Sequence, residues 1–366
     1  MGGYAKFLPP TSTFPLPLSQ SFPPDRSIPL QPEQTIGELG EQALLAQLQK
    51  FSPAEITGDD AAVFDLLNSD SLVISTDMLV ENVHFSEQTT SAFDIGWRGT
   101  AANLSDLAAM GATPTGITVA LALPPSTTLA WILAVYKGLT ACLEPWQTPI
   151  LGGDVSRSPL KTISITVLGQ VPQGKALYRH QAKVGDWLIA TGDHGASRAG
   201  LACLLHTHGE ELLTTEQRNL WQRAHQRPQP RLDLVPSLLS LETTIGAMDS
   251  SDGLADAVLQ ICRASQLGAE LWAEKLPIPE GLTAWVGLET AREWTLYGGE
   301  DFELILALPP LAAQKWLAAI ASLDLLPDRR PRIIGKIVTG TEVFLTSGNG
   351  VKEKLSLQEG FQHFHA

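Results

Sequence analysis

Cysteine, positive charge and long apolar runs are all scarce in this sequence of 366 residues. Its three cysteines, Cys142, Cys203 and Cys262, are far apart and form no CxxC pair, so they indicate neither a disulfide framework nor a zinc site. No uninterrupted apolar stretch reaches the roughly 18 residues that a membrane-spanning helix needs. We therefore expect a protein of the reducing cytoplasm that has no membrane partner.

Lysine and arginine are outnumbered by aspartate and glutamate, 25 to 39, and the formal net charge is −14. Duplex nucleic acids bind proteins through a basic face that displaces counterions, so we expect no nucleic-acid partner. Two like unit charges about 4 Å apart repel by roughly 4 kcal/mol at an effective dielectric constant of 20. Acidic loops can therefore face phosphate ligands only with divalent cations between them.

Motifs of several enzyme classes are also missing. HExxH, GxSxG and a Cys–His pairing do not occur, so metalloprotease and nucleophile-triad chemistries have no support. The run from Gly169 to Ala176 has the glycine and lysine spacing of a phosphate-binding P-loop. However, Ala176 has no hydroxyl group for Mg²⁺, and Pro172 has no backbone N–H for a phosphate. We predict a turn between strands at this position.

The sequence does contain six short acidic signatures that adjoin apolar segments. They are Gly58-Asp59-Asp60, Ser75-Thr76-Asp77, Asn103-Leu104-Ser105-Asp106, Gly152-Gly153-Asp154, Met248-Asp249-Ser250-Ser251-Asp252 and Gly298-Gly299-Glu300-Asp301. A carboxylate beside Gly, Ser or Thr at a strand end or turn can provide oxygen ligands to Mg²⁺, and its neighbours can present backbone N–H groups to phosphate. Taken together, the six predict one polar site assembled from distant parts of the chain.

Four of the six signatures also have a purely structural interpretation. An ordinary tight turn explains the first, and a helix cap explains residues 75–77. Asn103 and Asp106 share one face of an apolar helix because they are three residues apart, and a metal or an internal hydrogen bond would satisfy either side chain. Capping of the following helix explains one aspartate of residues 249–252 but not all of them. Glycines before Glu300 permit close backbone approach and favour a ligand contact there.

Periodicity and composition predict three segments: a proline-rich extension over residues 1–32, an N-terminal domain over 33–178 and a C-terminal domain over 179–366. The predicted helices cover 35–50, 95–110, 129–143, 196–206, 214–225 and 254–264. The predicted strands cover 72–77, 117–123, 150–151, 162–171, 187–190, 302–308, 333–338 and 343–346. Because strands and helices alternate without a strict βαβ period, we predict a fold that combines α/β and α+β parts.

Taken in order, the segments from residue 35 to 364 resemble the thiamine-monophosphate kinases, a family of the aminoimidazole-ribonucleotide-synthetase-like ATP-binding superfamily. The resemblance is carried by residues 74–77 with His84-Phe85, and by residues 102–112, 151–154, 249–254, 298–304 and 360–364. The string NLSDLAAMGA and the GGED motif followed by a closing glycine–aromatic–x–His–Phe favour this family over its relatives. The sequence departs from the family pattern in its proline-rich extension and at Phe361-Gln362.

The resemblance implies an N-terminal domain whose four-stranded sheet pairs across a homodimer, and an active site in the cleft between the two domains. It implies that ATP and thiamine phosphate give ADP and thiamine diphosphate, with several Mg²⁺ ions. The implied metal ligands are Asp60, Ser75, Thr76, Asp77, Asp106, Asp154, Asp249 and Asp252. The implied nucleotide contacts are Tyr136, Gly153, Arg179 and Ser251, and the implied substrate contacts are His84, Glu300 and Phe361.

The chemistry of a phosphate acceptor agrees with this assignment. The second pKa of a phosphate ester is about 6, so the acceptor is already ionised at neutral pH and needs no strong general base. The protein must supply in-line alignment and charge neutralisation, and we expect no catalytic residue beyond metal-assisted alignment. One alternative is another synthetase of the same superfamily, such as a selenophosphate synthetase, which generally carries a reactive cysteine near its N-terminus; this chain has no cysteine before Cys142. The C-terminal cysteine of a hydrogenase-maturation relative is absent as well. The other alternative is a nucleotide-binding scaffold without turnover.

Overall fold

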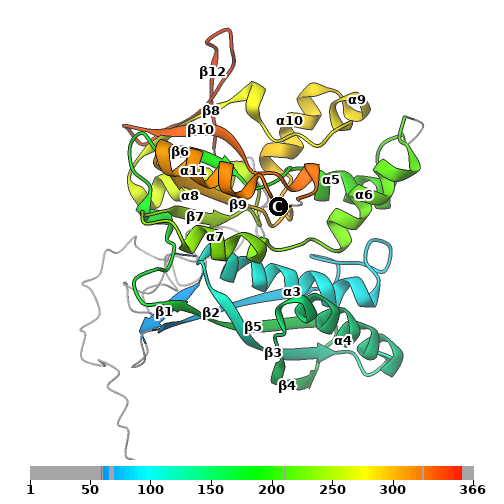
Figure 1. The fold of residues 1–366 in the computed structure, drawn as a ribbon. Helices are drawn as coiled ribbons and strands as arrows, with labels where there is room; N and C mark the ends of the chain where they lie inside the picture. The colour runs from blue at the N-terminus through cyan, green and yellow to red at the C-terminus, as the bar shows by residue number, and fades with distance from the viewer. Residues whose placement is uncertain (1–58, 60, 66–69, 210–211, 324, 357–366) are drawn as a thin grey trace, which may run out of the picture. The chain divides into compact units, whose positions relative to one another are not determined.

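The computed structural model describes residues 59, 61–65, 70–209, 212–323 and 325–356. The proline-rich residues 1–32, the helix predicted over 35–50, and the predicted site residues Asp60 and Phe361 lie outside the described residues. The described residues form two β-sheets, each accompanied by its own helices (Figure 1).

The first sheet has five strands in the order β1-β2-β5-β3-β4. Their bounds are Ala62–Asp65, Asp70–Val80, Thr162–Pro172, Thr113–Leu123 and Ile150–Arg157. All neighbours pair antiparallel except β3 and β4, which are parallel. Every second residue of β5 from Ile163 to Val171 is buried, which is the period of a strand with one covered face. The resemblance implied a sheet of four strands, and this expectation is wrong because the sheet has five.

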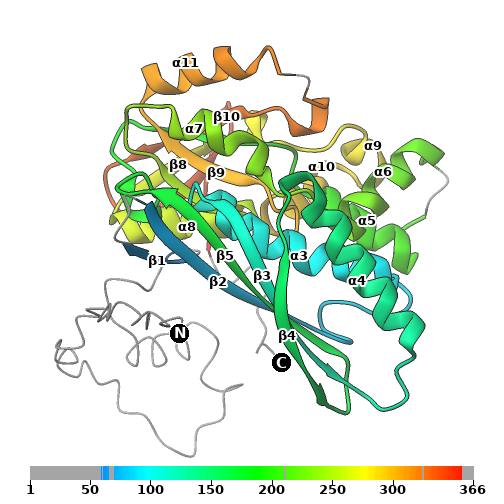
Figure 2. The same ribbon diagram turned by 60° about the horizontal axis from the view of Figure 1, so that its bottom comes forward.

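Two helices cover one face of this sheet, α3 at Ala92–Ala109 and α4 at Leu129–Leu143 (Figures 1 and 2). Ser91 accepts a hydrogen bond from the backbone N–H of Asp94 and caps α3, so this helix begins three residues before its predicted start. The helices approach closely because Gly96 and Gly138 lack side chains: a Cβ atom on either would collide with a backbone carbonyl of the other helix.

The second sheet has seven strands in the order β12-β11-β8-β10-β6-β9-β7. Their bounds in that order are Lys352–Lys354, Val343–Thr346, Gly268–Trp272, Arg332–Val338, Trp187–Ala190, Leu304–Leu308 and Gly246–Asp249. All five residues of β9 are buried, because alternate side chains enter two hydrophobic clusters, one on each face of the sheet.

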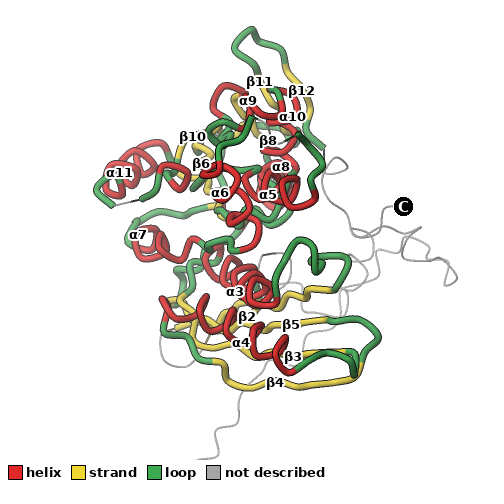
Figure 3. Tube along the Cα trace, turned by 90° about the vertical axis from the view of Figure 1, so that its right-hand side faces the viewer, coloured by secondary structure: helices red, strands yellow, loops and turns green. Residues whose placement is uncertain are grey.

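The helices that accompany the second sheet are α5 at Ala196–Leu205, α6 at Thr215–Gln226, α7 at Val235–Leu239, α8 at Leu254–Ser265, α9 at Leu282–Val286, α10 at Leu288–Tyr297 and α11 at Pro310–Ile320. Buried residues of α8 share one cluster with Ile305, whereas Trp316 of α11 shares the other cluster with Leu306. These helices lie around the second sheet in the view of Figure 3. Among the described residues, no helix combines the length and apolar character needed to cross a bilayer.

Most predicted elements are confirmed within a few residues. The strand predicted over 302–308 begins only at Leu304, because Glu300 and Phe302 adopt positive φ angles of 59° and 51° and end the regular backbone there. The P-loop-like segment is a turn as predicted: Lys175 N–H donates to the carbonyl of Pro172 over 2.9 Å, directly after β5.

Candidate active site

Three of the acidic signatures meet where β2, α3 and β7 come together. Ser75 of β2 donates a hydrogen bond to the Asp106 carboxylate of α3. The neighbouring Ser105 donates to Asp249 of β7 over 2.7 Å, and Ser251 donates to the same carboxylate over 3.2 Å. The structure thus brings together five residues that the sequence places in signatures up to 176 positions apart, from Ser75 to Ser251.

This cluster is polar inside a largely apolar surrounding. Asp249 and Ser105 are buried, and a buried carboxylate is stable only with hydrogen-bond donors or cations near it. Each serine hydroxyl donates one hydrogen bond, so the Asp106 and Asp249 carboxylates keep lone pairs that can accept further contacts. The donor set consists of carboxylate and hydroxyl oxygens, the ligand type that suits Mg²⁺, so these residues fit that metal.

The GGED signature adjoins the same cluster through the backbone. Glu300 N–H donates to the carbonyl of Ser251 over 2.7 Å. Gly299 has a positive φ of 66°, and a Cβ atom there would lie 2.9 Å from the carbonyl oxygen of Ser251. Glycine is therefore required for the two loops to approach this closely.

Asp301, next to Glu300, has a structural role. Its carboxylate accepts the backbone N–H groups of Gly195 over 2.7 Å and Ser197 over 2.9 Å, at the beginning of α5. Burial raises the pKa of the Asp301 carboxyl to about 7, although both N–H groups favour the charged form. These two bonds hold the GGED loop against α5.

Arg98 of α3 joins two of the predicted substrate contacts. Its Nη1 donates to the backbone carbonyl of His84 over 2.9 Å, and its Nη2 donates to the Glu300 carboxylate. The His84 ring accepts the Val80 N–H through Nδ1 over 3.0 Å, which closes the turn after β2. Sequence reasoning missed Arg98; the available signal was a lone cation in the apolar stretch that begins α3.

His225 of α6 lies beside this ion pair. Its Nε2 is 3.4 Å from Arg98 Nη1, and its Nδ1 is 3.1 Å from Ser197 Oγ and 3.8 Å from Glu300 Oε2. Burial, followed by the charge of Arg98, lowers the pKa of His225 well below its usual value. His225 is therefore neutral at neutral pH, and Arg98 is the cation that faces Glu300.

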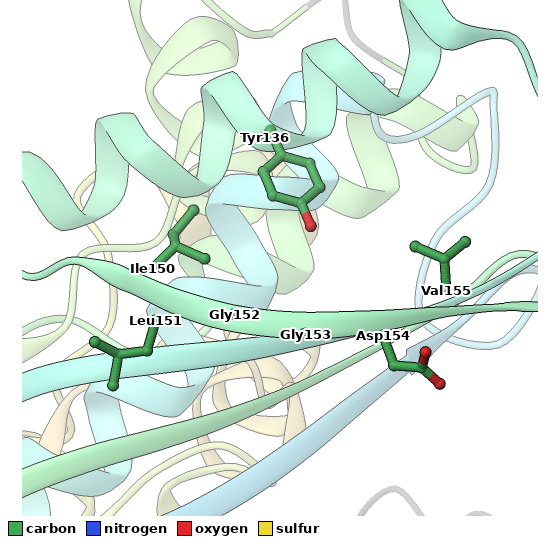
Figure 4. Close-up of a pocket in the computed structure, with 7 residues that line it drawn as sticks. All are labelled: Tyr136, Ile150, Leu151, Gly152, Gly153, Asp154 and Val155. Carbon is green, nitrogen blue, oxygen red and sulfur yellow. The ribbon is translucent and has the colours of Figure 1, made fainter.

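A pocket of about 430 Å³ lies between α4 and β4 and is lined by Tyr136 and by residues 150–155 (Figure 4). Two predicted nucleotide contacts, Tyr136 and Gly153, therefore share one pocket. The other two lie elsewhere: Ser251 is in the cluster described above, and Arg179 donates its backbone N–H to Asp59 over 2.8 Å and accepts from Ser265 over 3.0 Å.

Asp154 and Thr76 point away from the cluster. The register aligns Asp154 with Ala120, Ser164 and Met78 on four successive strands. At the usual strand spacing, Asp154 and Met78 are therefore about 14 Å apart. In Figure 4 the Asp154 carboxylate lies on the opposite side of β4 from Tyr136. Thr76 donates to the carbonyl of Ile165 over 2.9 Å.

The remaining predicted ligands, Asp77 and Asp252, are half-buried and exposed, respectively. Within the part of the chain that the structure describes, no group of three or more His, Cys, Asp or Glu side chains could hold a metal ion. Asp60 lies outside that part. The assignment of all eight residues as metal ligands therefore stays a prediction.

Comparison with known proteins supports a single family. The family model described as AIR synthase related protein, N-terminal domain, matches residues 58–171, and its C-terminal counterpart matches residues 183–347. The chain is 50% identical over 337 residues to the thiamine-monophosphate kinase of Synechococcus elongatus, covering 91% of this chain and 98% of the relative. It is 37% identical to that of Prochlorococcus marinus, with the same two coverages.

A solved structure of similar fold, AaThiL complexed with AMPPCP and TMP, superimposes with a TM-score of 0.76 at 28% identity. The match covers 91% of this chain and all of the other. Both matched domains therefore lie in one continuous similarity that includes all six acidic signatures from residue 58 onward.

Proposed function

Because this chain belongs to the thiamine-monophosphate kinases, among the AIR synthase related proteins, we propose that it transfers the γ-phosphoryl group of ATP directly to thiamine phosphate, giving ADP and thiamine diphosphate. The observation that carries this proposal in the structure is the meeting of Ser75–Asp106 with Ser105–Asp249. It joins two signatures of the N-terminal family domain to one of the C-terminal family domain in a single oxygen-rich cluster.

Phosphoryl transfer between two polyanions requires alignment and charge neutralisation more than acid–base chemistry. We propose Mg²⁺ as the metal, held by residues among Asp60, Ser75, Thr76, Asp77, Asp106, Asp154, Asp249 and Asp252. When bound, Mg²⁺ neutralises the phosphate charges that the acidic cluster would otherwise repel. The protein contributes the hydroxyl–carboxylate pairs that fix the orientation of Asp106 and Asp249.

The two substrates are assigned to different parts of the chain. We propose that the pocket lined by Tyr136 and Gly153 contacts the nucleotide, together with Arg179 and Ser251. Glu300, the His84 turn and Phe361 would contact thiamine phosphate. The partly exposed Glu300 carboxylate, held from behind by Arg98, suits a hydrogen-bond donor on the aminopyrimidine.

We also propose that the first sheet pairs with that of a second copy, giving a homodimer. In support, the sheet face away from α3 carries the exposed side chain of Met78, and Leu151 of the edge strand β4 is exposed as well. Sedimentation velocity checks this: a dimer that the substitution Met78→Lys weakens is expected, and a monomer at all concentrations would contradict it. A cytoplasmic location stays a prediction from the cysteine content.

The proposed reaction is tested by incubating the protein with ATP, Mg²⁺ and thiamine phosphate and identifying products by mass spectrometry. We expect thiamine diphosphate and ADP, and no product when thiamine replaces thiamine phosphate. Bound ATP with no phosphorylated product would support a nucleotide-binding scaffold instead. Omission of Mg²⁺ should stop the reaction, which tests the metal separately.

A further inference from the structure

Arg98 is a buried cation on α3, with a side chain that is 3% exposed. Removing a guanidinium from water is costly unless its N–H groups are paired. Here Nη1 donates to the His84 carbonyl and Nη2 donates to the Glu300 carboxylate. The carbonyl fixes the guanidinium in place, so the direction from Arg98 to Glu300 is set by the backbone of the turn after β2.

The contact with Arg98 determines where the Glu300 carboxylate lies. Its backbone is tied to Ser251, but its φ of 59° is an unusual conformation for a non-glycine residue. The nearby His225 is neutral and lies 3.8 Å from Oε2. Arg98 is therefore the charged side chain that holds the Glu300 carboxylate by a direct hydrogen bond.

A second buried arginine shows what a purely structural ion pair looks like in the same chain. Arg231 pairs with Glu303, and their side chains are 0% and 7% exposed. In the Arg98–Glu300 pair the arginine is equally enclosed, but the Glu300 side chain is 35% exposed. Glu300 thus contacts Arg98 on one side, and the rest of its side chain is accessible to solvent.

We infer that Arg98 is a positioning residue that orients Glu300 for thiamine phosphate and so sets the affinity for this substrate without contacting ATP. This inference rests on the proposed function. Arg98 acts through Glu300: its fork of N–H groups fixes the direction in which the carboxylate points. Lysine, with a single point of charge, cannot bridge the His84 carbonyl and Glu300 in the same geometry.

The test compares Arg98→Lys with Arg231→Lys as a matched control in the full chain. For Arg98→Lys we expect KM for thiamine phosphate to rise about tenfold or more, the cost of a misaligned charged hydrogen bond, while KM for ATP stays within about twofold. Arg231→Lys should lower the melting temperature and leave both KM values unchanged. Equal changes in both KM values for Arg98→Lys would show a general structural role and overturn the inference.

A double variant keeps the test valid if Arg98→Lys folds poorly. Arg98→Met with Glu300→Gln removes both charges of the pair at once, which a folded protein tolerates better than one unpaired buried charge. Because Arg98 acts through Glu300, this variant should have the same KM for thiamine phosphate as Glu300→Gln alone. A further rise of tenfold would mean that Arg98 acts independently of Glu300, which would contradict the inference.

Failure of the inference and failure of the proposed function are distinguishable. If the wild-type chain forms no thiamine diphosphate, the function itself is wrong, and with it the inference. If the wild-type chain turns over and the Arg98 variants keep normal KM values for thiamine phosphate, only the inference fails. Thermal shifts with thiamine phosphate and with a non-hydrolysable ATP analogue provide a binding readout that does not depend on turnover.

Discussion

Ser105 of α3 donates a hydrogen bond to the Asp249 carboxylate of β7 over 2.7 Å, and both residues are buried. The two lie 144 positions apart, in the two different domains that the family models match. The residue after Ser105 is Asp106, which accepts from Ser75. One turn of α3 therefore connects the Asp106 carboxylate with the Asp249 carboxylate.

The substitution Asp106→Asn tests the proposed metal role. The amide has nearly the shape of the carboxylate but lacks its charge, so we expect folding to be retained and kcat to fall by roughly a hundredfold or more. Steady-state rates over a range of Mg²⁺ concentrations measure this effect. Glu144→Gln, at an exposed position after α4, is the control and should change nothing. A near-normal rate for Asp106→Asn at ordinary Mg²⁺ would remove Asp106 from the ligands.

The substitution Glu300→Gln tests the assignment of the thiamine phosphate site. It removes the charge that pairs with Arg98 and weakens acceptance of a hydrogen bond, so KM for thiamine phosphate should rise more than KM for ATP. Initial rates with each substrate varied separately give both constants. Glu289→Gln, on the exposed side of α10, serves as the control. An equal effect on both substrates would exclude Glu300 from the acceptor site.

Asp301 makes the stability of the fold depend on pH. Its pKa is raised to about 7 from the ordinary 3.8, so the folded state holds a proton that the unfolded chain has lost. This stabilisation is complete below about pH 4 and is lost as pH rises towards 7, with a slope of roughly 1.4 kcal/mol per pH unit. Urea unfolding at pH 5 and pH 7 should show a smaller decline for Asp301→Asn than for wild type. Parallel declines would show that Asp301 does not titrate in this range.

Gly138 is predicted to be essential for the packing of α4 against α3. A Cβ atom there would collide with the backbone carbonyl of Phe93, and backbone atoms cannot move aside as a side chain can. We expect Gly138→Ala to lower the free energy of unfolding by about 1–3 kcal/mol or more. Thr140→Ala, exposed on the same helix, should cost much less. Equal values for the two variants in urea unfolding would contradict the close helix contact.

The sequence predicted best the elements whose pattern is local. The alternation of Ile163, Ile165 and Val167 with polar residues marks β5 from periodicity alone. The strand β7, by contrast, has four residues that are all buried, so it shows no alternation. The sequence therefore predicted no strand there, only the signature that ends it at residues 249–252. Likewise, β8 and α10 carry no signal that stands out from their neighbours.

The candidate site was predictable as a set of residue types, and its connections were not. The signatures indicate Asp106 and Asp249 as candidate ligands. Which hydroxyl group donates to which carboxylate depends on how α3 packs against β2 and β7. Arg98 and Glu300 are 202 positions apart, and no local pattern relates them. Conversely, the register aligns Asp154 with Met78 on the fourth strand and not with Asp77, which the sequence could not reveal.

ATP labelled in its γ-phosphoryl group distinguishes direct transfer to thiamine phosphate from hydrolysis. For direct transfer we expect the label in thiamine diphosphate, one molecule for each ADP formed, and both products to form roughly a hundredfold more slowly with Asp106→Asn. Label released as inorganic phosphate, with thiamine phosphate unchanged, would contradict direct transfer.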